Sequence, residues 1–153
     1  MGCAQMTLFE LGQRFIGAKE ITGSKDNPLI VWMLQLSNPV VEDDETHWCS
    51  AYVNAMAWIL RRPRSKSNTA RSWLGVARPI GLAEARAEED VVILQRGFGI
   101  QPGPEVLHGA PGHVGLFAGL EGQEVLILGG NQANAVNISR YPISRVLGVR
   151  RLL

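Results

Sequence analysis

The amino-acid sequence predicts an α+β domain in which N-terminal helices pack on an antiparallel β-sheet. Three observations indicate this class. Apolar residues recur at helical spacing before Pro63, short β-rich runs separated by Gly or Pro turns follow Asp90, and 46% of the 153 residues are hydrophobic. Helices followed by consecutive strands are typical of such a fold. Because this length suits one core, we expect residues 1–153 to form a single domain with a core of about 8–151.

Three helices are expected in the first half, each ended by a residue that breaks or caps it. Leu8, Leu11 and Phe15 recur at helical spacing before Gly17, and Pro63 ends the longest helix. An acidic run at 42–45 before that helix, and arginines at its end, match the helix dipole. The expected helices are 7–16, 29–36 and 47–62, with shorter helical segments at 69–74 and 82–89.

Five strands are expected in the second half, where the hydrophobic period changes. They are 91–95, 113–118, 124–128, 135–139 and 146–153. Because side chains alternate along a strand, His113, Gly115 and Phe117 share one face of 113–118. Val114 and Leu116 share the other.

Charge and composition exclude several classes of function. Fifteen Lys and Arg balance 14 Asp and Glu, so the usual electrostatic argument for nucleic-acid binding is missing. The two cysteines, Cys3 and Cys49, imply no disulfide framework. The most apolar stretch, 29–36, is too short to span a bilayer, and the N-terminus lacks a signal-peptide pattern. We expect a protein made in the cytoplasm, with no nucleic-acid partner and no stable membrane insertion.

Cys49 stands at the start of the longest expected helix. There a thiol faces unpaired backbone N–H groups and the positive end of the helix dipole, which favour the nucleophilic thiolate. The alternative is a small apolar residue packed in the core, and position alone favours that alternative. Cys49 is therefore a candidate nucleophile if a base lies near it.

Three histidines are candidates for that base. His47 lies two residues before Cys49 and points to a different side, and His108 lies in a Gly- and Pro-rich loop. His113 opens a strand between glycines that leave space beside the ring, which suits a base in a groove. A half-buried structural histidine fits that position equally well. These residues form no zinc-binding pattern, so we expect neither a metal nor another cofactor.

A third polar group is usually needed to hold the imidazole of a Cys–His pair. Asn131 and Gln132 end the second strand of the hairpin that begins at His113. If this hairpin turns at 119–122, both residues return beside the ring. Turn chemistry is the alternative explanation for the sequence Gly-Gly-Asn at 129–131.

Several blocks of sequence resemble the NlpC-type and CHAP-type cysteine peptidases, in particular a phage and prophage subgroup. They occur in the expected order and cover nearly the whole chain, from about residue 8 to 151. The blocks are residues 17–28, 44–54, 69–74, 112–115 and 130–142.

The resemblance implies a papain-like fold and a catalytic role for three residues. Members of this family cut peptide or amide bonds in bacterial peptidoglycan. Matched motif to motif, Cys49 takes the position of the nucleophile, His113 that of the general base and acid, and Asn131 that of the polar residue that orients the histidine. Some CHAP-type members carry a carboxylate two residues before that polar residue, where this chain has Gly129.

Five further residues are candidates for substrate binding: Tyr52, Trp48, Arg71, Trp73 and Gln132. Tyr52 reaches either the groove or the core, and the two tryptophans either line a cleft or pack inside. Arg71 either binds a substrate carboxylate or lies on a solvated helix face. Gln132 is a candidate because it lies next to the orienting position.

Together these expectations predict a peptidoglycan hydrolase with a Cys–His thiol mechanism, either an endopeptidase or an N-acetylmuramoyl-L-alanine amidase. A phage or prophage endolysin fits best; it would reach peptidoglycan in the periplasm or cell wall with the help of a holin. One alternative is a secreted antibacterial amidase effector with an immunity protein. An alternative of another class is a non-catalytic cell-wall-binding or structural phage protein. No separate wall-binding domain is expected, and Cys3 and His108 have no predicted role.

Overall fold

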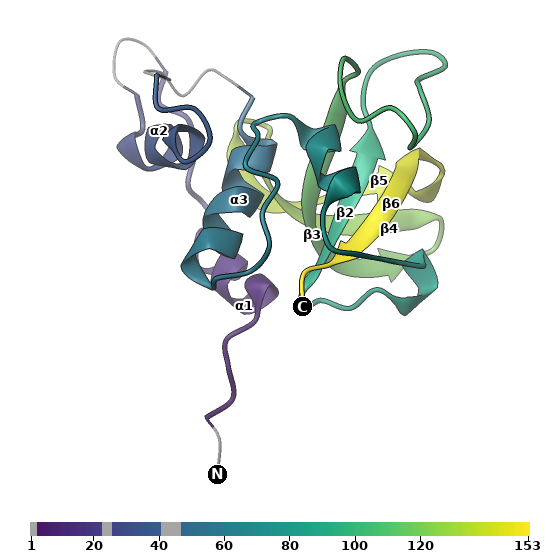
Figure 1. The fold of residues 1–153 in the computed structure, drawn as a ribbon, viewed down its shortest axis with the longest axis horizontal. Helices are drawn as coiled ribbons and strands as arrows, with labels where there is room; N and C mark the ends of the chain where they lie inside the picture. The colour runs from purple at the N-terminus through teal and green to yellow at the C-terminus, as the bar shows by residue number, and fades with distance from the viewer. Residues whose placement is uncertain (1–2, 23–25, 41–46) are drawn as a thin grey trace.

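The computed structural model describes residues 3–22, 26–40 and 47–153. Within these ranges three α-helices lie on one side of a six-stranded antiparallel sheet (Figure 1), which confirms the predicted α+β class. The helices are α1 (Leu8–Gln13), α2 (Pro28–Gln35) and α3 (Cys49–Ile59). The acidic run at 42–45 lies outside the described residues, so its match to the helix dipole stays a prediction.

Helices α1 and α3 are shorter than expected and α2 is shifted by one residue, because local features of the chain set their ends. Thr7 caps α1 through a capping box, in which its hydroxyl accepts from the Glu10 backbone N–H at 3.1 Å. The side chain of Asn27 caps α2, and Pro28 occupies its first turn. Helix α3 ends at Ile59 because Arg61 has a left-handed φ of 57°. The chain therefore leaves the helix before the predicted end at residue 62.

The sheet has the strand order β1-β6-β2-β3-β4-β5. Its strands are β1 (Arg78–Ile80), β2 (Asp90–Gln95), β3 (Gly112–Glu121), β4 (Glu124–Gln132), β5 (Ala135–Pro142) and β6 (Val146–Arg151). The five predicted strands are present, and β1 is an additional edge strand that the sequence analysis missed. The helix predicted at 82–89 is wrong beyond one turn of 3-10 helix, Leu82–Glu84, because β2 begins soon after it. The segment 69–74 is a 3-10 helix, η1 (Ala70–Gly75).

Two apolar clusters cover the two faces of the sheet. On the helix side, Val114 and Leu116 of β3 join the residues of α1, α2 and α3. On the other side, Phe117 packs with residues of β2, β4 and β6. This division confirms the predicted alternation along β3. None of the helices that the structure describes is long and apolar enough to cross a membrane.

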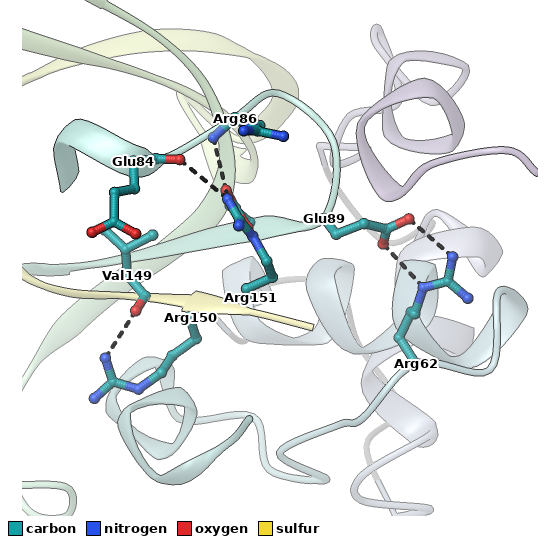
Figure 2. Close-up of polar contacts among 8 residues, drawn as sticks. Arg62, Glu84, Arg86, Glu89, Val149, Arg150 and Arg151 are labelled. Carbon is teal, nitrogen blue, oxygen red and sulfur yellow. Dashed lines mark hydrogen bonds and ion pairs between the residues drawn. The ribbon is translucent and has the colours of Figure 1, made fainter. Parts of the chain in front are cut away.

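Ion pairs join α3, β2 and β6 at the end of the sheet where the C-terminus lies (Figures 1 and 2). Arg62, just past α3, holds both carboxylate oxygens of Glu89 at 2.9 and 3.0 Å (Figure 2). Arg151 holds both oxygens of Asp90 at 2.8 and 2.9 Å. Such paired contacts are the strong form of a charge-assisted hydrogen bond. They fix the C-terminal end of α3 against the beginning of β2, and the opposite end of α3 carries the candidate site.

Candidate active site

Cys49 is the first residue of α3 and is almost completely buried, with 2% of its surface exposed. The residue before it, Trp48, makes no side-chain cap, so the first N–H groups of the helix have no side-chain partner there. The backbone N–H groups of Val114 and Ser50 donate toward the sulfur. The thiol therefore lies where β3 passes the N-terminus of α3.

Burial controls the charge of this thiol. Loss of water raises the pKa of Cys49, and this effect outweighs the backbone donors and the positive charge of Arg96, which lower it. The helix N-terminus was expected to favour thiolate. The structure corrects that expectation, since burial makes the neutral thiol the stable form. A base must then remove the proton before the sulfur can act as a nucleophile.

His113 is the second residue of β3 and lies opposite Leu94 of β2. It is buried, and the next residue is Val114, whose N–H faces the Cys49 sulfur. The chain thus brings the two predicted residues to one place. Among the described residues, no hydrogen bond joins the side chains of Cys49 and His113. Hydrogen bonds between catalytic groups are often long before substrate binds.

The side chain of Gln132 fixes the protonation of the His113 ring. Its Oε1 lies 2.9 Å from His113 Nε2. Its Nε2 donates to the backbone oxygen and Oδ1 of Asn137 at 2.7 and 2.9 Å, so the amide has one orientation. Because Oε1 only accepts, His113 Nε2 carries the proton. The Nδ1 of the neutral ring is therefore unprotonated and free to act as a base.

This contact corrects the prediction for Asn131. In a regular strand Asn131 would share a face with Gly129, which lies against His113 and the Gln132 amide. Asn131 instead has a left-handed φ of 55°, at a register shift between Gly129 and Gln132. The extra residue moves Gln132 onto the face of His113. The Asn131 amide turns to His47 Nδ1, at 3.2 Å.

Tyr141 completes the network and is a residue with no predicted role. Its hydroxyl donates to Gln132 Oε1 at 3.1 Å and lies 3.3 Å from His113 Nε2. The two rings pack with centroids 5.2 Å apart. A signal existed in the sequence, because Asn137, Ser139 and Tyr141 alternate on β5 and all three belong to this network.

Burial also lowers the pKa of His113. Desolvation lowers it to about 4, with a smaller contribution in the same direction from Arg96, while the Gln132 contact raises it. The imidazole is therefore neutral at pH 7. A neutral thiol and a neutral imidazole with an unprotonated Nδ1 are the protonation states from which general-base activation of a thiol starts.

Two pockets open beside this pair. One, of about 370 Å³, is lined by Cys49, by His47 and Thr69, and by the loop residues Gly97 and Pro111. The other, of about 360 Å³, is lined by residues of the His113 network. Arg96, directly after β2, lines both. One pocket therefore leads to the Cys49 sulfur and the other to the His113 ring, and the Arg96 guanidinium lies between them.

Three of the predicted substrate-binding residues are buried in the core. Trp48 and Tyr52 lie against the backbone of Gly130, where a Cβ would come within 2.8 Å of either side chain. The Tyr52 hydroxyl donates to the Gly12 oxygen at 3.0 Å, and Trp73 donates to Ser50 Oγ at 2.9 Å. Their hydrophobic area and satisfied polar atoms explain this position. Of the two alternatives for these residues, the structure shows packing in the core, so the prediction that they line the substrate cleft is wrong.

Arg71 neither faces solvent nor enters the pockets. It is 1% exposed, and its guanidinium donates to the backbone oxygens of Pro102, Gly103, Val106 and Pro111 at 2.8–3.1 Å. Arg71 of η1 therefore holds the loop between β2 and β3, which forms one wall of the Cys49 pocket. No sequence signal distinguishes this arginine from one on the surface.

Among the described residues, no three His, Cys, Asp or Glu side chains gather around a common point. The sequence matches no family model and none of the curated proteins. Its structure is similar to that of NlpC1 from Trichomonas vaginalis, with a TM-score of 0.53 and 15% sequence identity. The match covers 95% of this chain and 42% of that one, so this chain spans less than half of its neighbour. The fold is thus NlpC-like.

Proposed function

We propose that this protein is a papain-like cysteine hydrolase that cuts an amide or peptide bond of bacterial peptidoglycan. One observation carries the proposal: Cys49 starts a helix beside His113, and Gln132 holds that histidine with Nδ1 free. This is the arrangement that nucleophilic catalysis by a thiol requires. The NlpC-like fold and the sequence blocks that resemble phage NlpC-type and CHAP-type peptidases support the choice of substrate.

The reaction begins from neutral groups. His113 Nδ1 takes the proton of Cys49 as the sulfur attacks the amide carbonyl, and the imidazolium then gives this proton to the leaving amine. Gln132 Oε1 accepts from Nε2–H throughout and keeps the ring in place. The Cys49 backbone N–H lies at the free end of α3, where it can donate to the oxyanion. Water, activated by His113, then releases the acyl group from sulfur.

We place this activity in lysis by a phage or prophage endolysin that acts on the cell wall and depends on a holin for access. The support is the order of the sequence blocks, which resemble that subgroup from residue 17 to residue 142. Peptidoglycan is the proposed partner. An endopeptidase and an N-acetylmuramoyl-L-alanine amidase use the same thiol chemistry, and the fragments released distinguish them.

The test is incubation of purified peptidoglycan with the wild-type protein, Cys49→Ala and Cys3→Ala. Cys3 is an exposed free cysteine, so Cys3→Ala is a matched control for loss of a thiol. We expect fragments from the wild type and Cys3→Ala and none from Cys49→Ala. Mass spectrometry identifies the bond from the new fragment ends. Equal release by all three proteins would exclude the thiol mechanism, and binding without release would favour a non-catalytic wall-binding protein.

A further inference from the structure

Arg96 is the cation between the two pockets of the candidate site. It follows the last residue of β2 and lines both the pocket that contains Cys49 and the pocket that contains His113. Among the described residues that line these pockets, none is Asp or Glu. A negatively charged group that enters either pocket therefore meets positive charge without a competing carboxylate from those residues.

The hydrogen bonds of Arg96 leave most of its guanidinium free. Its Nη1 lies 3.3 Å from Nδ1 of His47, a nitrogen that the Asn131 amide also contacts. Arginine can only donate, so His47 accepts through Nδ1 in this contact. In the part of the chain that the structure describes, no carboxylate pairs with Arg96 and its other N–H groups have no partner.

Other arginines of the molecule show the contrast. Arg62 and Arg151 each hold a carboxylate with two hydrogen bonds, and Arg71 donates to four backbone oxygens. Their donors stabilise the fold. Arg96 is exposed, is held at one nitrogen by His47, and presents the rest of its planar group to the pockets. A guanidinium in this state suits a carboxylate, which it can bind through two parallel hydrogen bonds.

We propose that Arg96 binds a carboxylate of the substrate next to the amide that Cys49 attacks. The inference rests on the proposed function, because it assigns a substrate contact to the same site. It names the substrate class as a peptide that carries a free carboxylate beside the scissile bond. The sequence indicated Arg71 as a candidate for a carboxylate contact. This proposal assigns that contact to Arg96, because Arg96 lines the two pockets and Arg71 does not.

The test uses two reagents of similar size that differ in charge. Iodoacetate and iodoacetamide both alkylate a thiolate, forming a sulfur–carbon bond and releasing iodide, but only iodoacetate carries a carboxylate. The rates are measured on Cys49 in a Cys3→Ser background, because Cys3 is exposed. The iodoacetamide rate reports the reactivity of the thiol, including the effect of nearby charge on its pKa. The ratio of the iodoacetate rate to the iodoacetamide rate reports binding of the carboxylate.

We expect Arg96→Gln to lower this ratio about tenfold, the equivalent of one charge-assisted interaction. Arg96→Lys, which keeps the charge but loses the paired donors, should lower the ratio by a smaller factor. Arg140→Gln removes an exposed arginine paired with Glu121 and should leave the ratio unchanged. Thermal unfolding of each variant checks that the fold is intact.

Two results would overturn the inference. In the first, Arg96→Gln lowers both rates equally, which would mean that Arg96 acts only on the thiol. In the second, the ratio falls in Arg145→Gln and not in Arg96→Gln, which would assign the carboxylate to the other arginine of the His113 pocket. Neither result depends on peptidoglycan. If the wild type released no fragments from peptidoglycan but Arg96→Gln still lowered the ratio tenfold, the proposed function would be contradicted and the inference about Arg96 would not.

Discussion

The two ends of α3 hold buried polar groups by opposite means. Past its C-terminal end, Arg62 and Glu89 are both charged and bind each other through two hydrogen bonds. At its N-terminal end, burial keeps Cys49 and His113 neutral by raising the pKa of one and lowering that of the other. The first arrangement is complete within the protein. The second leaves a proton free to move and a guanidinium, Arg96, without a carboxylate among the described residues.

The C-terminal end of α3 therefore contributes to the stability of the fold, whereas the N-terminal end carries the groups proposed to react. A buried ion pair that loses one partner leaves an uncompensated charge, so its members are tied to the fold. A neutral pair costs less to bury and gains charge only when the proton moves. Substitutions at the two ends of α3 should therefore change different quantities.

The largest effect is expected at the charged end. Glu89→Gln should lower the free energy of unfolding by about 4 kcal/mol, because Arg62 keeps its charge and loses its partner. Urea denaturation measures this loss. The rate of Cys49 alkylation by iodoacetamide in the folded protein should not change. A loss of stability below about 1 kcal/mol would show that the pair is only a surface contact.

The next effect is a pH dependence that originates at the neutral end. The pKa of His113 is about 4 in the folded protein and about 6.5 in the unfolded chain, so the unfolded state binds more protons between these values. The contribution of His113 to the free energy of unfolding is fully present above pH 6.5. It falls by about 3 kcal/mol as the pH decreases to about 4.

The control for this pH dependence is His113→Asn, which cannot titrate in that range. Urea denaturation of the two proteins at several pH values should show that the variant lacks this part of the acid destabilisation. Parallel curves for wild type and variant between pH 6.5 and 4 would contradict the assigned pKa of His113.

A smaller effect is expected from the residue that holds His113. Gln132→Leu removes the acceptor of both His113 Nε2–H and the Tyr141 hydroxyl, so the ring loses its orientation. Peptidoglycan hydrolysis should fall about 30-fold, equivalent to about 2 kcal/mol. Asn131→Gly, which removes the amide and keeps the left-handed φ of 55°, is the matched control and should stay within about twofold of the wild type. The reverse order of the two variants would return the orienting role to Asn131.

The smallest effect is expected at Gly129. A Cβ there would come within 2.7 Å of Gln132 Oε1, so Gly129→Ala should push the amide away from His113. This small displacement should reduce hydrolysis about fivefold, equivalent to about 1 kcal/mol. The control is Gly81→Ala, where the nearest atom would lie at 3.6 Å. Equal activities for these two variants would show that the amide adapts without cost.

Local sequence patterns predicted most of the secondary structure. The two-residue period of β3 depends on adjacent side chains alone, so the division of Val114 and Phe117 between the two apolar clusters followed from the sequence. Strand β1 was missed because it has three residues and contains Pro79, a pattern typical of an edge strand. The end of α3 was misjudged by three residues, since the left-handed Arg61 has no pattern of its own.

The site was predictable to the level of residue type but not of contact. Cys49 at a helix start and His113 at a strand start were candidates only, and the family resemblance gave them their roles, which stay predictions. The choice between Asn131 and Gln132 failed because a single left-handed residue reverses the alternation on which it relied. The role of Arg71 depends on loop oxygens that begin 31 residues later in the chain, and no local pattern carries that information.

The clamp made by Arg71 has a consequence for how this protein can diversify. Every contact that the guanidinium makes with the loop from Pro102 to Pro111 is to a backbone oxygen. The course of the loop is therefore specified from outside it, by main-chain atoms that nearly any residue would supply. Phe98 and Ile100, both fully exposed between β2 and this loop, are free to change while the pocket wall keeps its shape. The side chains of this segment can therefore change without moving the proposed catalytic pair beside it.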